Sequence, residues 1–191
     1  MLCDFSQHVG ITSFDGLLRS CEAMVAQGVI GGKGTIDPTF LTVLAGAIDP
    51  GGRNDFGTFT VKGDLILSPA AFLLVDVTAD QADKLVVTGD ATNPGIAALD
   101  GTIIFSKSGG AAPRHGQSYE VISATGGILG TFDNVLGRQG VLEPTLTYGP
   151  NSVTGTFVAG SLAANLQGAN AAALSFATAL DQLRQSNYNS L

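Results

Sequence analysis

The chain has 191 residues, of which 45% are hydrophobic and 13% charged, with 26 glycines and a net charge of −7. This length allows one domain with a substantial core, and the charged fraction is about half that of an average soluble domain. The 9 lysine and arginine residues are spread along the chain. Because nucleic acid and anionic lipid both require concentrated basic charge, neither is an expected partner.

Residues 1–27 are predicted to be irregular and partly helical. Apolar residues of the stretch FDGLLRSCEAMVAQG follow the i, i+3, i+4, i+7 and i+11 spacing of one helix face; they are Phe14, Leu17, Leu18, Cys21 and Val25. The N-terminus lacks the basic and apolar regions of a signal peptide, and no apolar run approaches the ~20 residues that cross a bilayer as a helix. If the protein is exported, we therefore expect this chain to be a piece of something longer.

Cys3 and Cys21 are the two cysteines of the chain. They either form a single disulfide or remain two free thiols, and the sequence leaves both readings open. Neither their spacing nor any neighbouring histidine suggests a zinc site.

Residues 28–159 have the pattern of an all-β structure, with short runs of Val, Ile, Leu, Phe and Thr separated by Gly, Pro, Asn and Asp. In TFTVK, Phe59 and Val61 alternate with Thr58, Thr60 and Lys62, which predicts one core face and one solvent face. The runs FLLVDV and TIIF are apolar on both faces, as expected for strands that are covered on both sides. YGPNSV, at 148–153, is a candidate hairpin turn.

Two nearly identical segments, VKGDL at 61–65 and VTGDA at 87–91, lie 26 positions apart. In each of them Gly63–Asp64 or Gly89–Asp90 ends a strand, where glycine supplies positive φ and aspartate caps the bend. A chain that bends at corners and returns after a fixed interval winds a coil, and such periods mark repeat architectures, β-solenoids included.

Residues 160–191 are predicted to be helical. Apolar residues recur in steps of four and three along this segment; they are Leu162, Leu166, Ala169, Ala173, Phe176, Leu180 and Leu183. The helix either packs on the β domain or forms an extended linker.

Known catalytic sets are not evident in the sequence, and we predict no catalytic residue, cofactor or metal site. GGKGTID at 31–37 resembles a calcium-binding nonapeptide, but it carries an extra residue before Asp37 and is unrepeated. The best candidates for a paired-carboxylate site are Asp64, Asp76, Asp83 and Asp90. Glycoside hydrolysis needs two carboxyl groups roughly 5 to 10 Å apart, yet an aspartate after glycine at a strand end is ordinary turn chemistry.

Several motifs, taken in order, resemble the C-terminal part of a bacterial autotransporter passenger domain. They are AIDPGG within 46–52, GTFTVKG at 57–63, DKLVVTG at 83–89, YEVISA at 119–124 and GTF at 130–132, and the Ala-rich NAAALSFATALDQL is similar to the segment that leads to the translocator. Order and spacing hold across about 130 residues. Residues 1–27 do not match, and neither a signal peptide nor a C-terminal barrel is present, so the chain is an excised piece or an incomplete gene product on this interpretation.

The resemblance implies a right-handed parallel β-helix that ends in a β-sandwich-like cap, the autochaperone region, followed by a linker helix at 160–191. The cap would template passenger folding at the outer surface of a Gram-negative cell, with upstream passenger rungs and a downstream translocator barrel as partners. Tyr119, Phe132, Tyr148 and Phe157 would be core aromatics of the cap. This function is not enzymatic.

Two other functions remain open from the sequence. The first is a surface adhesin module that binds a glycan or a host protein through exposed loops such as 106–117. The second is a β-helical polysaccharide hydrolase or lyase that uses stacked aspartates, among them Asp64 and Asp90.

Overall fold

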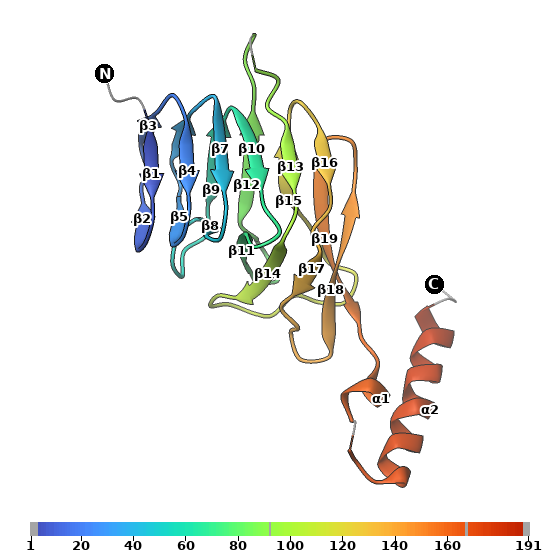
Figure 1. Ribbon diagram of the computed structural model, residues 1–191. Coiled ribbons are helices and arrows are strands. Elements are labelled where there is room, and N and C mark those ends of the chain that lie inside the picture. Colours follow the sequence, from blue (N-terminus) through green and yellow to red (C-terminus); the bar gives the residue numbers. More distant parts are fainter. Residues whose placement is uncertain (1–3, 92, 167, 189–191) are drawn as a thin grey trace.

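The computed structural model describes residues 4–91, 93–166 and 168–188. In these residues nineteen strands form three sheets, and the chain visits the sheets in the same order in every turn, with two strands added to the third sheet in the last turn (Figure 1). Sheet A consists of β1 (Phe5–Gln7), β4 (Ala23–Val25), β7 (Phe40–Val43), β10 (Asp64–Leu67), β13 (Ala97–Leu99) and β16 (Ile128–Gly130). The chain therefore winds a three-sided coil.

The other two sheets complete this coil. Sheet B consists of β2 (Ile11–Ser13), β5 (Val29–Gly32), β8 (Ala47–Pro50), β11 (Phe72–Val77), β14 (Thr102–Lys107) and β17 (Asn134–Leu136). Sheet C consists of β3 (Leu17–Arg19), β6 (Thr35–Asp37), β9 (Thr58–Lys62), β12 (Lys84–Thr88), β15 (Ser118–Ala124), β19 (Ser152–Ala159) and β18 (Leu142–Tyr148). Neighbouring coils pair in parallel, and the two pairings that involve β19 are antiparallel. The prediction of an all-β parallel β-helix is confirmed.

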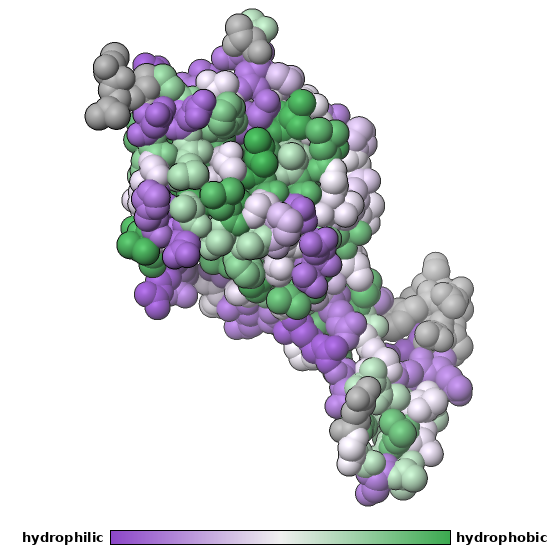
Figure 2. All heavy atoms as spheres, in the orientation of Figure 1, coloured by the Kyte–Doolittle hydropathy of each residue, from purple (hydrophilic) through white to green (hydrophobic). Residues whose placement is uncertain are grey.

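Alternation along the strands places one row of side chains from each sheet inside the coil. In β9, Phe59 and Val61 are fully buried while Thr58 and Lys62 are exposed, as their alternation predicts. The inner rows of the three sheets form one continuous core. Figure 2 also shows apolar area on the outside, over strands β7, β10 and β13.

The helical prediction for residues 14–25 is wrong, because this segment forms β3, β4 and the turns beside them. Phe14 lies against Phe59 with ring centroids 5.6 Å apart, and Leu18 packs on the core, whereas Leu17 is 55% exposed. Three-residue strands joined by short turns place inward residues at spacings that imitate a helix face. Cys21 is disulfide-bonded; Cys3 lies outside the described residues.

The length of a coil changes along the molecule. In sheet A, Phe5 pairs with Ala23 and Ala23 with Leu41, an interval of 18 residues in both cases. Leu65 pairs with Ala97, an interval of 32. Later coils therefore carry longer corners, while the strands keep their places in the stack.

The C-terminal segment is helical, as predicted, but its helix is interrupted. α1 (Leu162–Asn165) and α2 (Ala171–Tyr188) form a hairpin beyond the last strand (Figure 1). Gly168 adopts φ +90° in the connection, which breaks the continuous stripe that the sequence suggests. Among the described residues, we find no helix long and apolar enough to span a bilayer.

Candidate functional site: a capped end and an open end

The β18–β19 hairpin covers the C-terminal end of sheet C, while β16 and β17 are the outermost strands of sheets A and B at this end. Tyr148 pairs with Val153 across the predicted turn, where the Gly149 N–H donates to the Ser152 carbonyl at 2.8 Å. β19 then pairs antiparallel with β15. Because β19 runs against the direction of the coil, it covers the edge of sheet C with a strand that cannot continue the winding.

Three aromatic rings join this hairpin to the coil. Phe157 on β19 is fully buried, with its ring centroid 5.5 Å from Phe105 and 6.2 Å from Tyr119, both in edge-to-face geometry. The half-buried Tyr119 packs against the core, and its hydroxyl donates to the Thr78 carbonyl at 2.6 Å. Phe157 and Tyr119 therefore pack between the hairpin and the coil.

The other two predicted aromatics, Phe132 and Tyr148, are joined by a hydrogen bond. Phe132 is 6% exposed, and its backbone N–H donates to the Tyr148 hydroxyl at 3.0 Å. Burial raises the pKa of the Tyr148 hydroxyl above its usual value, although the bond from Phe132 lowers it in part. This pair connects the corner between β16 and β17 to the hairpin.

β15 contains a bulge at the place where the parallel coil meets the antiparallel cap. The register with β19 shifts between Glu120 and Ile122, and Val121 and Ile122 are both fully buried although they are adjacent. The extra residue lets Tyr119 face the cap while Ile122 faces the coil, where it pairs with Leu85. The sequence analysis did not identify this bulge, whose signal is the uninterrupted apolar pair.

At the N-terminal end, β1, β2 and β3 are the outermost strands of their sheets. Each pairs on one side, with β4, β5 or β6, among the described residues. Gln7 is buried at this end, and its Nε2 donates to the carbonyls of Gly10 and Val29 at 2.8 and 2.9 Å. Its Oε1 is a buried acceptor without a hydrogen bond in the described part of the chain.

The two Gly-Asp corners differ in the structure. Gly63 has φ +155°, and a Cβ there would lie 2.0 Å from the Pro38 carbonyl oxygen, so the position requires glycine. Asp64 Oδ1 accepts the Ile96 N–H at 2.7 Å, which ties one coil to the next. Asp64 therefore acts as a hydrogen-bonding cap.

Gly89 and Asp90 begin a longer corner. The repeated segments do lie side by side, since Val61 pairs with Val87. The next pairing is Leu65 with Ala97, so the corner after Gly89 is six residues longer than the corner after Gly63. Asp90 Oδ1 accepts the Asn93 N–H at 3.0 Å inside this corner. The two aspartates thus serve different turns and do not occupy equivalent places in the stack.

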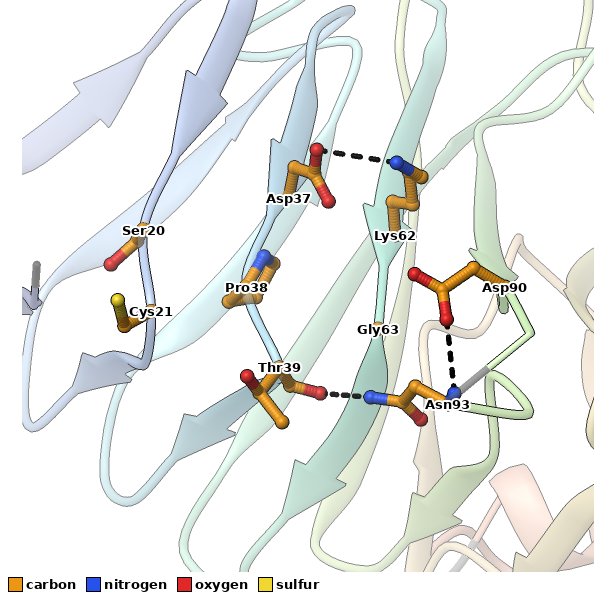
Figure 3. A pocket seen from close by; sticks show the side chains of 9 residues that line it. All are labelled: Ser20, Cys21, Asp37, Pro38, Thr39, Lys62, Gly63, Asp90 and Asn93. Carbon is orange, nitrogen blue, oxygen red and sulfur yellow. Dashed lines mark hydrogen bonds and ion pairs between the residues drawn. The ribbon is translucent and has the colours of Figure 1, made fainter.

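A polar groove of about 300 Å³ lies beside these corners (Figure 3). Asp37 and Lys62 form an ion pair at 3.3 Å on one side, and the Asn93 side-chain amide donates to the Thr39 carbonyl on the other. Asp37, the aspartate of GGKGTID, is thus paired with a lysine. Within the described residues, we find no set of three potential ligands that could hold a metal ion.

The remaining candidate acids gather at a different corner, between sheets B and C. Asp83 is fully buried, and its two oxygens accept the N–H groups of Gly57 and Asp76 at 2.9 and 2.8 Å. Burial, with a smaller contribution from the charge of Asp76, raises the pKa of Asp83 to about 7 and that of Asp49 to about 6. Both Asp83 oxygens accept backbone N–H groups, and the side chain is inaccessible to solvent. Asp83 therefore has a structural role, because it links the backbones at Gly57 and Asp76.

The sequence analysis missed Asp49. It lies on β8 and Asp76 on the adjacent β11, so the coil brings together two carboxylates that are 27 residues apart in sequence. The segment AIDPGG carries the signal, because an aspartate that ends a strand before Pro-Gly-Gly lies at a corner.

Loop 106–117 is held in place at two points, by the corner after β11 and by β19. The Ala79 N–H donates to the Ala111 carbonyl at 2.8 Å, and the Gly116 N–H donates to the Phe157 carbonyl at 2.8 Å. His115 Nδ1 accepts the Ala159 N–H at 3.0 Å. This loop therefore connects the coil with β19 of the cap.

Comparisons with known proteins leave the family open: no protein-family model matches the chain, and no curated protein matches it.

Proposed function

We propose that this chain is part of a bacterial autotransporter passenger domain, in which its capped coil templates the folding of further coils during export across the outer membrane. The observation that carries the proposal is the asymmetry of the coil. At one end an antiparallel hairpin covers sheet C, with β16 and β17 as the outermost strands of sheets A and B, whereas the other end presents three parallel edge strands.

Physical chemistry links this asymmetry to templating. A parallel coil that forms alone must order a whole turn of chain before its hydrogen bonds and buried side chains offset the lost entropy. A coil that forms against β1, β2 and β3 gains those interactions as each strand is laid down.

The cap gives the process a direction. β19 cannot extend the parallel winding of sheet C, so a complete three-sheet coil can be added at the open end but not beyond the hairpin. The helices follow the cap, and on this proposal they lead from the cap toward the translocator. Folding that proceeds away from the membrane would oppose backward movement of the exported chain.

The test is the order in which the chain folds. Refolding from denaturant is followed by pulsed hydrogen exchange and mass spectrometry, and we expect the amides of β15, β18 and β19 to become protected before those of β1–β6. Protection that begins in β1–β6, or simultaneously along the chain, would contradict a templating cap.

Two phenylalanines provide matched variants for this experiment. Phe157 in the cap and Phe59 in the coil are both fully buried and both in edge-to-face contact with another ring. We expect Phe157→Ala to delay protection of every strand, because the cap belongs to the folding nucleus, and Phe59→Ala to leave cap protection unchanged. Equal effects of the two substitutions on cap protection would count against the proposal.

A further inference from the structure

The outer face of sheet A carries a row of uncharged side chains in strand register. Met24 pairs with Thr42, Thr42 with Ile66, Ile66 with Ala98, and Ala98 with Leu129. Ile66 is 42% exposed and Leu129 58% exposed. With Thr42 as its polar member, this row is largely apolar, and Figure 2 shows apolar area on the outside over β7, β10 and β13.

An acidic row borders the apolar one. Asp4 and Glu22 directly precede β1 and β4, and Asp64 begins β10 opposite Phe40. Phe40 and Met24 line an apolar groove of about 340 Å³ whose rim includes Asp4 and Glu22. The six strands of sheet A contain no lysine or arginine.

On sheet C, acidic residues form ion pairs with basic residues of neighbouring strands. Asp37 pairs with Arg19 at 3.6 Å and with Lys62 at 3.3 Å, and Glu120 pairs with Lys84 at 2.6 Å. Within the described part of the chain, Asp4 and Glu22 on sheet A have no ion pair. Sheet A therefore combines apolar area with negative charge that the chain itself does not neutralise.

We propose that the outer face of sheet A docks an amphipathic helix of a protein partner, with the apolar stripe of the helix on the Met24–Leu129 row and basic side chains along the acidic row. Charge complementarity identifies the partner as basic. The Met24–Leu129 row crosses five strands, which at the usual spacing extend about 19 Å, and a helix of roughly 13 residues matches this length.

Other occupants fit this face less well. A second copy of the chain would bring its own charge of −7. Its α2 offers exposed Phe176 and Leu183, but Arg184 is already held by Asp181 and the Gly160 carbonyl. An anionic membrane would be repelled by Asp4, Glu22 and Asp64.

The experiment uses the full chain and a fluorescent synthetic peptide of leucine and lysine, about 14 residues long and roughly 21 Å as a helix. Fluorescence anisotropy measures its binding. We expect saturable binding that weakens with added salt, and much weaker binding of a leucine–glutamate analogue and of a scrambled leucine–lysine peptide. Equal binding of the scrambled peptide would overturn the proposal, because it would mean unspecific attraction to a negative protein.

Leu129 and Leu136 provide the matched variants. They lie on successive strands, β16 of sheet A and β17 of sheet B, and are 58% and 51% exposed. We expect Leu129→Ser to weaken binding roughly tenfold and Leu136→Ser to leave it unchanged. Glu22→Gln should reduce the salt dependence, whereas Glu120→Gln on sheet C should not.

Three further outcomes would overturn the proposal. The first is equal loss of binding in Leu129→Ser and Leu136→Ser. The second is concentration-dependent dimerisation that Leu129→Ser abolishes, since a second copy would then cover the face. The third is binding of the chain to anionic phosphatidylglycerol vesicles that the same substitution abolishes.

Discussion

At the scale of single residues, the cap depends on a glycine as much as on its aromatics. Gly155 lies opposite Tyr119 on the paired strand, and a Cβ there would lie 2.7 Å from the Phe105 ring. The space that glycine leaves lets the Phe105 ring reach Phe157. Close packing of this kind makes small changes in volume felt.

We expect Gly155→Ala to destabilise the protein by roughly 1 to 3 kcal/mol, because the added methyl group must displace a buried ring. Gly16→Ala is the control, since Gly16 has an ordinary φ and nothing within 4 Å of the added Cβ. Urea denaturation followed by circular dichroism measures both. A Gly155→Ala variant as stable as Gly16→Ala would mean that Phe105 can move aside.

The carboxylates at the corner between sheets B and C predict a pH dependence. Burial raises the pKa of Asp83 from its ordinary 3.8 to about 7 and that of Asp49 to about 6, and it raises that of Asp76. Between pH about 4 and pH about 7, these carboxyl groups bind more protons in the folded state than in the unfolded state. Their contribution to stability is therefore present below pH about 4 and is lost as the pH rises through 6 to 7.

We accordingly expect the free energy of unfolding to be larger at pH 5 than at pH 8. Asp83→Asn should flatten this slope, because the neutral amide removes the buried charge, while Asp133→Asn at an exposed position should keep it. Urea denaturation at both pH values is the measurement. A wild-type protein more stable at pH 8 would show that the backbone N–H bonds to Asp83 outweigh its burial.

At the scale of elements, α1 and α2 depend on one carboxylate. Asp181 on α2 accepts the Ser161 hydroxyl at 2.7 Å and the N–H groups of Leu162 and Ala163 at 2.9 and 3.0 Å. These bonds satisfy the first donors of α1 and lower the Asp181 pKa below its ordinary value. A four-residue helix has little stability of its own, so it needs this support.

We expect Asp181→Ala to increase hydrogen exchange at residues 162–165 while the strands keep their protection. The neighbouring exposed Gln182→Ala is the control and should change neither. Hydrogen exchange with mass spectrometry resolves the two regions. Loss of protection throughout β18 and β19 would instead show that the helices support the cap.

At the scale of the whole molecule, each coil contacts only its neighbours, so stability is expected to vary along the stack. Ile30 on β5 and Ile103 on β14 are both fully buried in sheet B. They differ in position: Ile30 is near the open end and Ile103 is next to the cap. This pair therefore tests whether the two ends are equivalent.

We expect Ile30→Ala to unfold the N-terminal coils in a separate transition at lower urea, and Ile103→Ala to lower the midpoint of the main transition. Hydrogen exchange at increasing urea distinguishes local from global opening. Two variants with the same single transition would mean that the coil unfolds as one unit.

The sequence predicted what depends on local pattern. Alternation in TFTVK, the turn in YGPNSV and the repeated Val-x-Gly-Asp segments specified strands, a hairpin and a coil. These features require no knowledge of what lies opposite in space. Phe132 and Phe157 were expected in a core only through the resemblance to passenger domains, and both are buried.

The sequence by itself determined that the chain winds a β-coil and ends in helix, since alternation, glycine corners and helical spacing are local. Only the tertiary structure decided that residues 5–25 form coils. It also decided that the corner after Gly89 is six residues longer than the corner after Gly63, so that Asp90 and Asp64 are not equivalent. Finally, it brought Asp49 close to Asp76 and Asp83. The physical reason is that a three-residue strand has no stability of its own. Its register, and the neighbours it brings together, are set by the coil on which it stacks.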